Sequence, residues 1–271
     1  MPCAAHGRGV RAVKYAPCDL WRDPPRNALA RLDAILAATT PPGPLTTFCR
    51  ADDVGMGGQK FIQMTDCFKK HGVPLALAVV PSWLPLGHAR LGRDIDLADP
   101  LFSPHQHGFS HRNTACEGKK AEFGDGLDEE ETRRRIRSGR DLLRRLLGAA
   151  FVPLFTPPWN RSSAATLRIL TEEEFRGVSR FAGATPAALP GLLELPVNVD
   201  LHIRKEAGVE MQFQGLLNEI GRAVASGHLG LMLHHQRATP GSAAFLDALL
   251  SRLAGRKDTR FLCARRVLGS S

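Results

Sequence analysis

The chain has 271 residues, 43% of them hydrophobic, which suits one large α/β domain with a substantial core. Its net charge of +9 would suit nucleic acid, but the cations are dispersed without a nucleic-acid-binding motif, so we expect no such partner and leave an anionic substrate open. The six cysteines form no C-x-x-C pair, which argues against a thiolate zinc site and a disulfide framework. No apolar run approaches the roughly 20 residues that span a bilayer, so we expect no membrane span and predict a cytoplasmic protein.

Predicted elements begin after an N-terminal extension, residues 1–23, which we expect to pack on the outside or stay mobile. Residues 24–271 are expected to form a single domain, in which "TTPPGP" (39–44) separates a first helix from the rest. Apolar or β-rich runs predict strands at 44–50, 74–80, 101–108, 151–157, 177–181, 192–199 and 229–235. Helical periodicity is found between them at 57–71, 128–147, 162–175, 210–226 and 241–255.

This alternation of strands and helices implies a parallel sheet, either closed as a barrel or open and doubly wound. The polar residues that suggest chemistry follow or end predicted strands, from "ADD" after the first to His234 at the end of the last. In a parallel α/β barrel the carboxyl ends of the strands share one face. Residues far apart in the sequence are therefore expected to meet there.

Two adjacent carboxylates, Asp52 and Asp53, stand in "CRADDVG", where their mutual repulsion needs an explanation. A divalent cation supplies one, because one carboxylate can ligate it while the other accepts a proton from the bound water. The alternative is a helix N-cap before "GMGGQKF", which explains one aspartate but not both.

The segment "HQHGFSH" contains His107 and His111 at i, i+4 and His105 and His107 at i, i+2. Either pair can chelate a metal, depending on whether the chain is helical or extended there. His234 ends the apolar run "LGLML" and suits a general acid. The alternative for "HQHGFSH" is a chance cluster of surface histidines. The alternative for His234 is a core or strand-end position without a catalytic role.

The order of "ADD", "HGFSH", "TPPWN" and "LMLH" resembles the metal-dependent polysaccharide deacetylase (NodB-like) superfamily over about seven tenths of the chain. The resemblance implies an irregular (β/α)7 barrel, similar to a TIM barrel, with parallel strands and outer helices. It also implies a site in which Asp52 is the catalytic base, His234 the catalytic acid, and Asp53, His107 and His111 the metal ligands. His105 is then expected outside the ligand set. Zinc is the expected metal, with Co²⁺, Ni²⁺, Mn²⁺ and Fe²⁺ as alternatives.

The sequence also departs from that family. Gly108 stands where the family has a serine or threonine, so a hydroxyl that steadies the histidine loop is missing, and Thr156 stands where it has an arginine that orients the base. Arg50 or Arg161 is a candidate to supply that cation. "RADDVG" also resembles the "NADDFG" opening of YdjC-like sugar deacetylases, so the substrate cannot be transferred from the polysaccharide enzymes.

Further polar and aromatic residues near the motifs are candidates for substrate binding. Trp159 could stack on a sugar ring or pack under a loop. Asn160 and Asp200, with Asn198 and His202, could bind substrate hydroxyls or orient His234. No phosphate loop or dinucleotide motif is complete, so we expect no nucleotide cofactor.

The sequence thus predicts a metal-dependent hydrolase of amide C–N bonds that deacetylates an N-acetylated sugar or sugar-containing precursor. Hydrolysis of a non-sugar amide is one alternative. A degenerate barrel that binds metal or carbohydrate without catalysis is another, and the missing arginine at Thr156 favours it. The expected partner is a small molecule or saccharide, and the sequence does not indicate an oligomeric state.

Overall fold

The computed structural model describes residues 15–84 and 91–269, and every strand predicted from the sequence is present. The strands are β1 (Leu45–Val54), β2 (Leu75–Val79), β3 (Phe102–His107), β4 (Leu154–Thr156), β5 (Gly177–Val178), β6 (Leu193–Glu194), β7 (Val199–Asp200), β8 (His228–Leu233) and β9 (Thr259–Phe261). β6 and β7 are the two ends of the strand predicted at 192–199. β9 was not predicted, and it pairs with the start of β1.

The sheet closes into a barrel through the stretch 193–200. All strand pairs are parallel, in the order β6-β5-β4-β3-β2-β1-β8-β7. The first half of the stretch pairs with β5, and its second half pairs with β8. A bridge between Phe181 and Val197 continues the pairing between these halves. The fold is therefore an irregular (β/α)7 barrel, as predicted.

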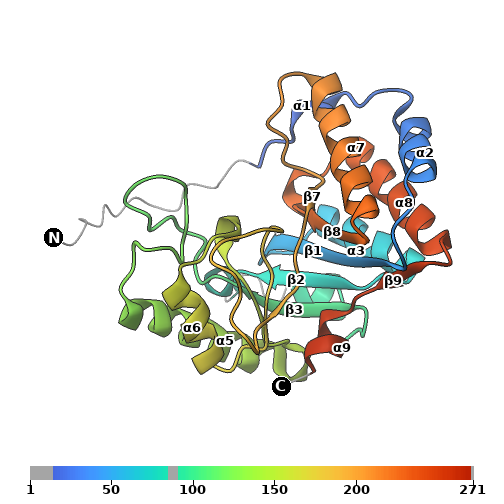
Figure 1. Cartoon of the computed structure of the whole chain (residues 1–271). Coiled ribbons are helices and arrows are strands. Elements are labelled where there is room, and N and C mark those ends of the chain that lie inside the picture. Colours follow the sequence, from blue (N-terminus) through green and yellow to red (C-terminus); the bar gives the residue numbers. More distant parts are fainter. Residues whose placement is uncertain (1–14, 85–90, 270–271) are drawn as a thin grey trace.

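Helices cover the outside of the barrel, and most follow a strand (Figure 1). The long helices are α2 (Ala28–Ala38), α3 (Gln59–His71), α5 (Glu129–Leu147), α6 (Ala164–Glu172), α7 (Val209–Ala225) and α8 (Pro240–Gly255). Short α-helices are α1 (Asp19–Arg22) and α9 (Ala264–Leu268), and 3-10 turns are η1 (Pro81–Trp83), η2 (Gly148–Ala150), η3 (Pro158–Asn160) and η4 (His235–Arg237). Within the described ranges, none of the helices combines the length and apolarity needed to cross a bilayer.

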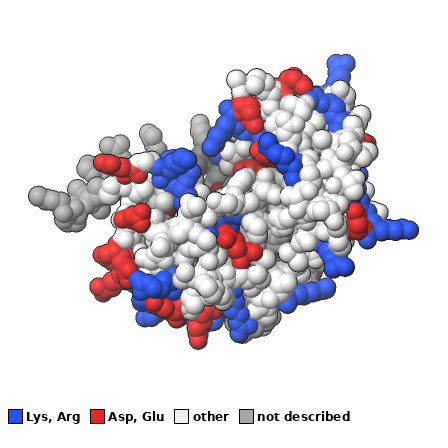
Figure 2. All heavy atoms as spheres, in the orientation of Figure 1, with Lys and Arg blue, Asp and Glu red and all other residues white. Residues whose placement is uncertain are grey.

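Many of the arginines lie on helix α5. Ile136, Leu143 and Leu147 form its buried stripe, and Asp128 caps its N-terminus by accepting a hydrogen bond from the Glu131 N–H. Its arginines pair with carboxylates of α5 and α6, Glu131, Glu172 and Glu173 among them. Figure 2 accordingly shows both signs of charge interleaved over the α5–α6 corner, at the lower left of the view.

The described part of the predicted extension, residues 15–23, packs onto the barrel. Leu20 and Trp21 are buried in the main hydrophobic core. The Trp21 indole N–H donates to the Leu201 carbonyl at 2.6 Å, and the Thr239 hydroxyl donates to the Trp21 carbonyl at 2.8 Å. Residues 1–14 lie outside the described ranges, and the boundary at residue 23 stays a prediction.

Candidate metal centre

Both aspartates of "ADD" lie at the carboxyl end of β1 and are almost fully buried, with 4% and 5% of their surface exposed. The pairing of β1 with β2 shifts register between Ala51 and Val54, and Asp53 has a left-handed backbone (φ 61°). This irregularity lets adjacent carboxylates meet different partners. Asp52 contacts Arg50, whereas Asp53 contacts the histidines of the predicted metal site.

Asp53, His107 and His111 come together as the sequence predicted. The Asp53 Oδ1 atom lies 3.3 Å from His107 Nε2 and 3.1 Å from His111 Nε2. The three ligand atoms all lie within 4.8 Å of one another. The His107 side chain is 2% exposed and that of His111 is 18% exposed, so the cluster is open on the His111 side.

The donor set of this cluster fits a divalent cation. His107 Nδ1–H donates to the Thr156 carbonyl at 2.9 Å, which leaves the Nε2 lone pair directed at the cluster, as in metal-binding histidines. Asp53 Oδ1 is buried without a hydrogen-bond partner among the described residues. Burial would raise the pKa of Asp53, but the nearby His107 and His111 rings outweigh it and hold the pKa below its usual range, so this carboxylate is ionised.

Glu122, which the sequence analysis missed, anchors the histidine loop. Its fully buried carboxylate accepts hydrogen bonds from the backbone N–H groups of Phe109, Ser110 and His111 and from the Ser110 hydroxyl, at 2.7–3.3 Å. Gly108 has φ +55°, and a Cβ there would lie 2.4 Å from Glu122 Oε2 and 2.6 Å from Pro158. Glu122 thus steadies the loop in place of the missing hydroxyl. A lone glutamate in a polar loop gives no sequence signal.

Arg50 is the cation that pairs with Asp52, since Thr156 carries no charge. Its fully buried guanidinium donates to both oxygens of Asp52, at 2.7 and 3.0 Å, and to the Ser179 hydroxyl at 2.6 Å. The charge of Arg50 outweighs burial and lowers the pKa of Asp52. Arg161, the other candidate, instead donates to the Lys120 carbonyl.

His105 lies outside the cluster, where both its ring nitrogens have partners. Nδ1–H donates to the Ser103 carbonyl at 3.0 Å, and Nε2 accepts from the Thr156 hydroxyl at 2.9 Å. Burial lowers the pKa of His105 to about 3, so the ring is neutral. Thr156 therefore binds two histidines, through its hydroxyl and its carbonyl.

His234 directly follows β8 and lies near both aspartates. Its Nδ1 is buried without a hydrogen-bond partner in the described structure and lies 3.9 Å from Asp200 Oδ1. Asp200 Oδ1 accepts two backbone N–H bonds, and burial raises the pKa of this carboxyl. The geometry thus places Asp200 beside His234, and His202 Nδ1 accepts the His234 backbone N–H at 3.1 Å.

Aromatic rings enclose the exposed side of His111. Trp159 lies 4.5 Å from the His111 ring and Trp83 lies 5.9 Å from it, between ring centroids. The Asn160 carbonyl oxygen accepts from Arg50 at 2.7 Å, so this amide already supports the buried ion pair. The two indoles form apolar walls beside the cluster.

Tyr15 reaches the cluster from the N-terminal segment, which the sequence analysis did not foresee. Burial, together with the nearby Asp53 carboxylate, raises the pKa of the Tyr15 hydroxyl. The Arg237 guanidinium lies 5.5 Å from the centre of the Tyr15 ring and donates to the Ala16 carbonyl at 2.7 Å. Residues 15 and 16 are thus tied to η4, directly after His234.

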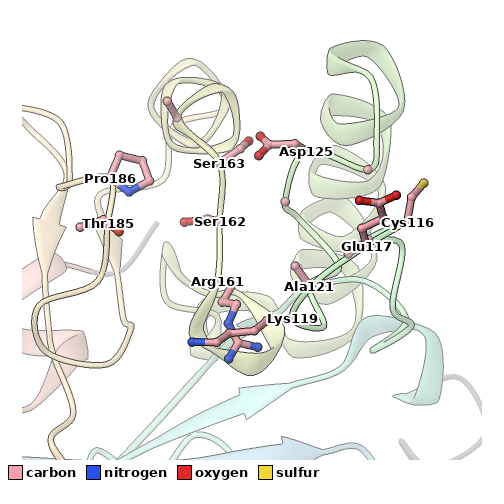
Figure 3. Close-up of a pocket in the computed structure, with 14 residues that line it drawn as sticks. Cys116, Glu117, Lys119, Ala121, Asp125, Arg161, Ser162, Ser163, Thr185 and Pro186 are labelled. Carbon is pink, nitrogen blue, oxygen red and sulfur yellow. The ribbon is translucent and has the colours of Figure 1, made fainter.

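A separate cavity of about 770 Å³ is lined by none of the three residues of the cluster. Figure 3 shows Thr185 and Pro186 on one wall and Cys116 and Glu117 on the opposite wall. Lys119 and Arg161 also line this hollow. The cavity therefore carries charges of both signs, and one of its cations, Arg161, directly follows Asn160 in the sequence.

No protein-family model and no curated protein matches the sequence. Solved structures match in fold. The Puue allantoinase has a TM-score of 0.62 at 13% identity, covering 91% of this chain and 96% of that one. The Bc1960 peptidoglycan N-acetylglucosamine deacetylase has a TM-score of 0.55 at 16% identity, covering 84% of this chain and 94% of that one.

A family 4 acetyl xylan esterase from Clostridium thermocellum, in complex with a cobalt ion, has a TM-score of 0.54 at 13% identity, covering 83% of this chain and 93% of that one. At these identities the likeness concerns the fold. The chain therefore has the barrel fold of the polysaccharide deacetylase (NodB-like) group.

Proposed function

We propose that this protein is a metal-dependent hydrolase of amide C–N bonds and that its substrate is an N-acetylated sugar or sugar-containing precursor. The observation that carries the proposal is the buried Asp53–His107–His111 cluster with the ionised Asp52 next to it. Zinc is our first choice of metal, because imidazole and carboxylate ligands suit it, although they also accept other first-row ions.

Asp53, His107 and His111 would hold the cation, which when bound supplies Lewis acidity and a more acidic water. Asp52 accepts the proton of the attacking water. Arg50 keeps Asp52 ionised and fixes its orientation through two hydrogen bonds, so the base is in its active state at neutral pH.

His234 donates a proton to the departing amine, the role of a general acid. Asp200 lies 3.9 Å from its Nδ1, where it can orient the ring. Trp83 and Trp159 provide apolar surface against which a sugar ring or an acetyl methyl group can pack.

Hydrolysis of a non-sugar amide is the second candidate, since the allantoinase structure matches over nearly the whole length of both chains. Comparing N-acetylated sugars with small cyclic amides as substrates separates the two. The ion pair between Arg50 and Asp52 supports catalysis over the non-catalytic alternative, because it provides a cation for the base although Thr156 is uncharged.

The test uses one substitution at each aspartate. Asp52→Asn should keep the metal and the fold but lower kcat by about 10²–10⁴, because the general base is lost. Asp53→Asn should lower metal affinity, because a neutral amide is a poorer ligand. Asp141→Asn on the exposed face of α5 is the control, with metal measured by elemental analysis.

Two results would contradict the proposal. One is a wild-type protein that retains no stoichiometric zinc, cobalt or nickel when these are supplied. The other is a metal-loaded protein that hydrolyses no acetylated or cyclic amide. If Asp52→Asn releases the metal and Asp53→Asn keeps it, the two roles are reversed.

A further inference from the structure

A second group of metal-type ligands lies on the outside of the barrel, between α3 and α8. Cys67 and His71 are one turn apart on α3, and Asp247 faces them from α8. The sulfur, a ring nitrogen and a carboxylate oxygen all lie within 4.8 Å of one another. The group shares no residue with the cluster at the end of β1.

The contacts within this group resemble those of the first cluster. Asp247 Oδ1 lies 2.9 Å from His71 Nε2 and 3.8 Å from Cys67 Sγ, compared with 3.1 and 3.3 Å from Asp53 to its histidines. The His71 side chain is 11% exposed and that of Asp247 is 40% exposed. The nitrogen ligand is therefore fixed between the helices, while the carboxylate side stays open to water.

Lys70 marks this point as one that attracts a positive charge. Its ammonium lies 2.7 Å from Asp247 Oδ1, on a side chain that is 62% exposed. A protonated amine has no lone pair for a metal, so Lys70 competes with a cation rather than binding it. Because such an exposed pair is weak, the side chain can turn into solvent and release the carboxylate.

We propose that Cys67, His71 and Asp247 form a second metal site, which takes a thiophilic divalent cation such as Zn²⁺ and links α3 to α8. Thiolate, imidazole and carboxylate are the ordinary ligands of zinc, and water completes a tetrahedral set. The sulfur selects Zn²⁺, Co²⁺ or Cd²⁺ over Mg²⁺ or Mn²⁺. Burial raises the pKa of Cys67 to about 12, so the thiol proton passes to solvent when the cation binds.

Cobalt distinguishes this site from the first cluster, whose three ligands include no sulfur. We would titrate Co²⁺ into the full chain carrying Asp53→Ala and His107→Ala, which disable the first cluster. A thiolate-to-cobalt charge-transfer band in the near ultraviolet should develop and saturate at one equivalent. Adding Cys67→Ser should remove the band, whereas Cys116→Ser should leave it.

Two further variants test the other ligands. His71→Asn should weaken Co²⁺ binding by at least about tenfold, as expected when one of three ligands is lost. Lys70→Met should strengthen it by up to about fivefold, because a competing ion pair of this kind contributes little. Circular dichroism and the thermal midpoint of each metal-free variant establish that it is folded.

The proposal is overturned if folded protein shows no thiolate band at millimolar Co²⁺, or if the band survives Cys67→Ser. If Lys70→Met leaves the Co²⁺ affinity unchanged, Lys70 does not compete with the cation for Asp247. Hydrolysis is measured separately, on the wild-type protein. An intact band in the double variant together with an inactive, metal-loaded wild type would count against the proposed function alone. An active wild type together with a folded double variant that shows no band would count against this second site alone.

Discussion

Arg50 is the residue on which the ionisation of Asp52 depends. Its guanidinium is fully buried and binds both Asp52 oxygens. Removing one partner of a buried ion pair leaves an uncompensated charge and costs about 3–5 kcal/mol. We expect Arg50→Met to lower the free energy of unfolding by this amount, measured by chemical denaturation.

Two controls accompany this variant. Arg161→Met removes a guanidinium that donates to the exposed Lys120 carbonyl, and it should change stability by no more than about 0.5 kcal/mol. Arg50→Met combined with Asp52→Asn removes both charges and should be less destabilising than Arg50→Met alone. Equal losses in the single and double variants would show that the pair is not the cause.

Tyr15 should act on the metal through Asp53. Because the Asp53 carboxylate lies close enough to act on the Tyr15 hydroxyl, Tyr15→Phe removes a polar neighbour of the proposed ligand. Polar groups around ligands are typically worth about tenfold or more in metal affinity. We expect that loss by calorimetric titration with Zn²⁺, at an unchanged thermal midpoint. Arg237→Ala, which releases Tyr15 and Ala16, should show the same loss. Unchanged affinity in both variants would show that Tyr15 only covers the site.

The supporting residues could not be predicted because their partners are distant in sequence. Asp52 and His107 stand in recognisable patterns, whereas Glu122 bonds a loop 11 to 13 residues before it and Arg50 bonds Ser179, 129 residues away. Such pairings depend on the assembled barrel. The sequence left Arg50 and Arg161 as candidates for the cation next to Asp52, and in the structure Arg50 contacts Asp52.

The histidine loop depends on one glycine at a left-handed position. Gly108→Ala adds backbone strain and a methyl group 2.4 Å from Glu122 Oε2, so we expect a loss of at least about 2 kcal/mol together with weaker metal binding. Gly148 has φ +53° with nothing within 4 Å of an added Cβ. Gly148→Ala should therefore cost about 1 kcal/mol and leave metal affinity unchanged. If both variants bind metal equally, the clash with Glu122 has no effect on the site.

At the level of elements, strands with continuous apolar runs were predictable. β2 and β8 are buried along almost their whole length, and their runs stand out in the sequence. The stretch 193–200 is read as two short strands because its pairing changes from β5 to β8 partway along. β9 has only three residues, none of them buried, so the sequence has no apolar pattern there that would predict a strand.

The whole protein should bind its metal less tightly as the pH falls. Burial would lower the pKa of His107, but the Asp53 and Asp52 carboxylates outweigh it and raise the pKa above the usual value. The protonated ring stabilises the metal-free protein at low pH and loses that effect as the pH rises through the raised pKa. Metal binding needs the neutral ring, so zinc affinity should fall steadily from about pH 7 to about pH 5. A flat profile would contradict this ligand set.

The centre is built from both ends of the described chain, since Arg237 holds Ala16 across 221 residues and His234 lies on the strand that pairs with β1. During synthesis on a ribosome, β1 emerges long before β8. Asp52 and Asp53 therefore remain without their partner strand until residues 228–233 have been made. A nascent chain stopped before residue 228 would carry Asp53, His107 and His111 yet lack the strand that pairs with β1, so a competent centre can form only after β8 and His234 have been synthesised.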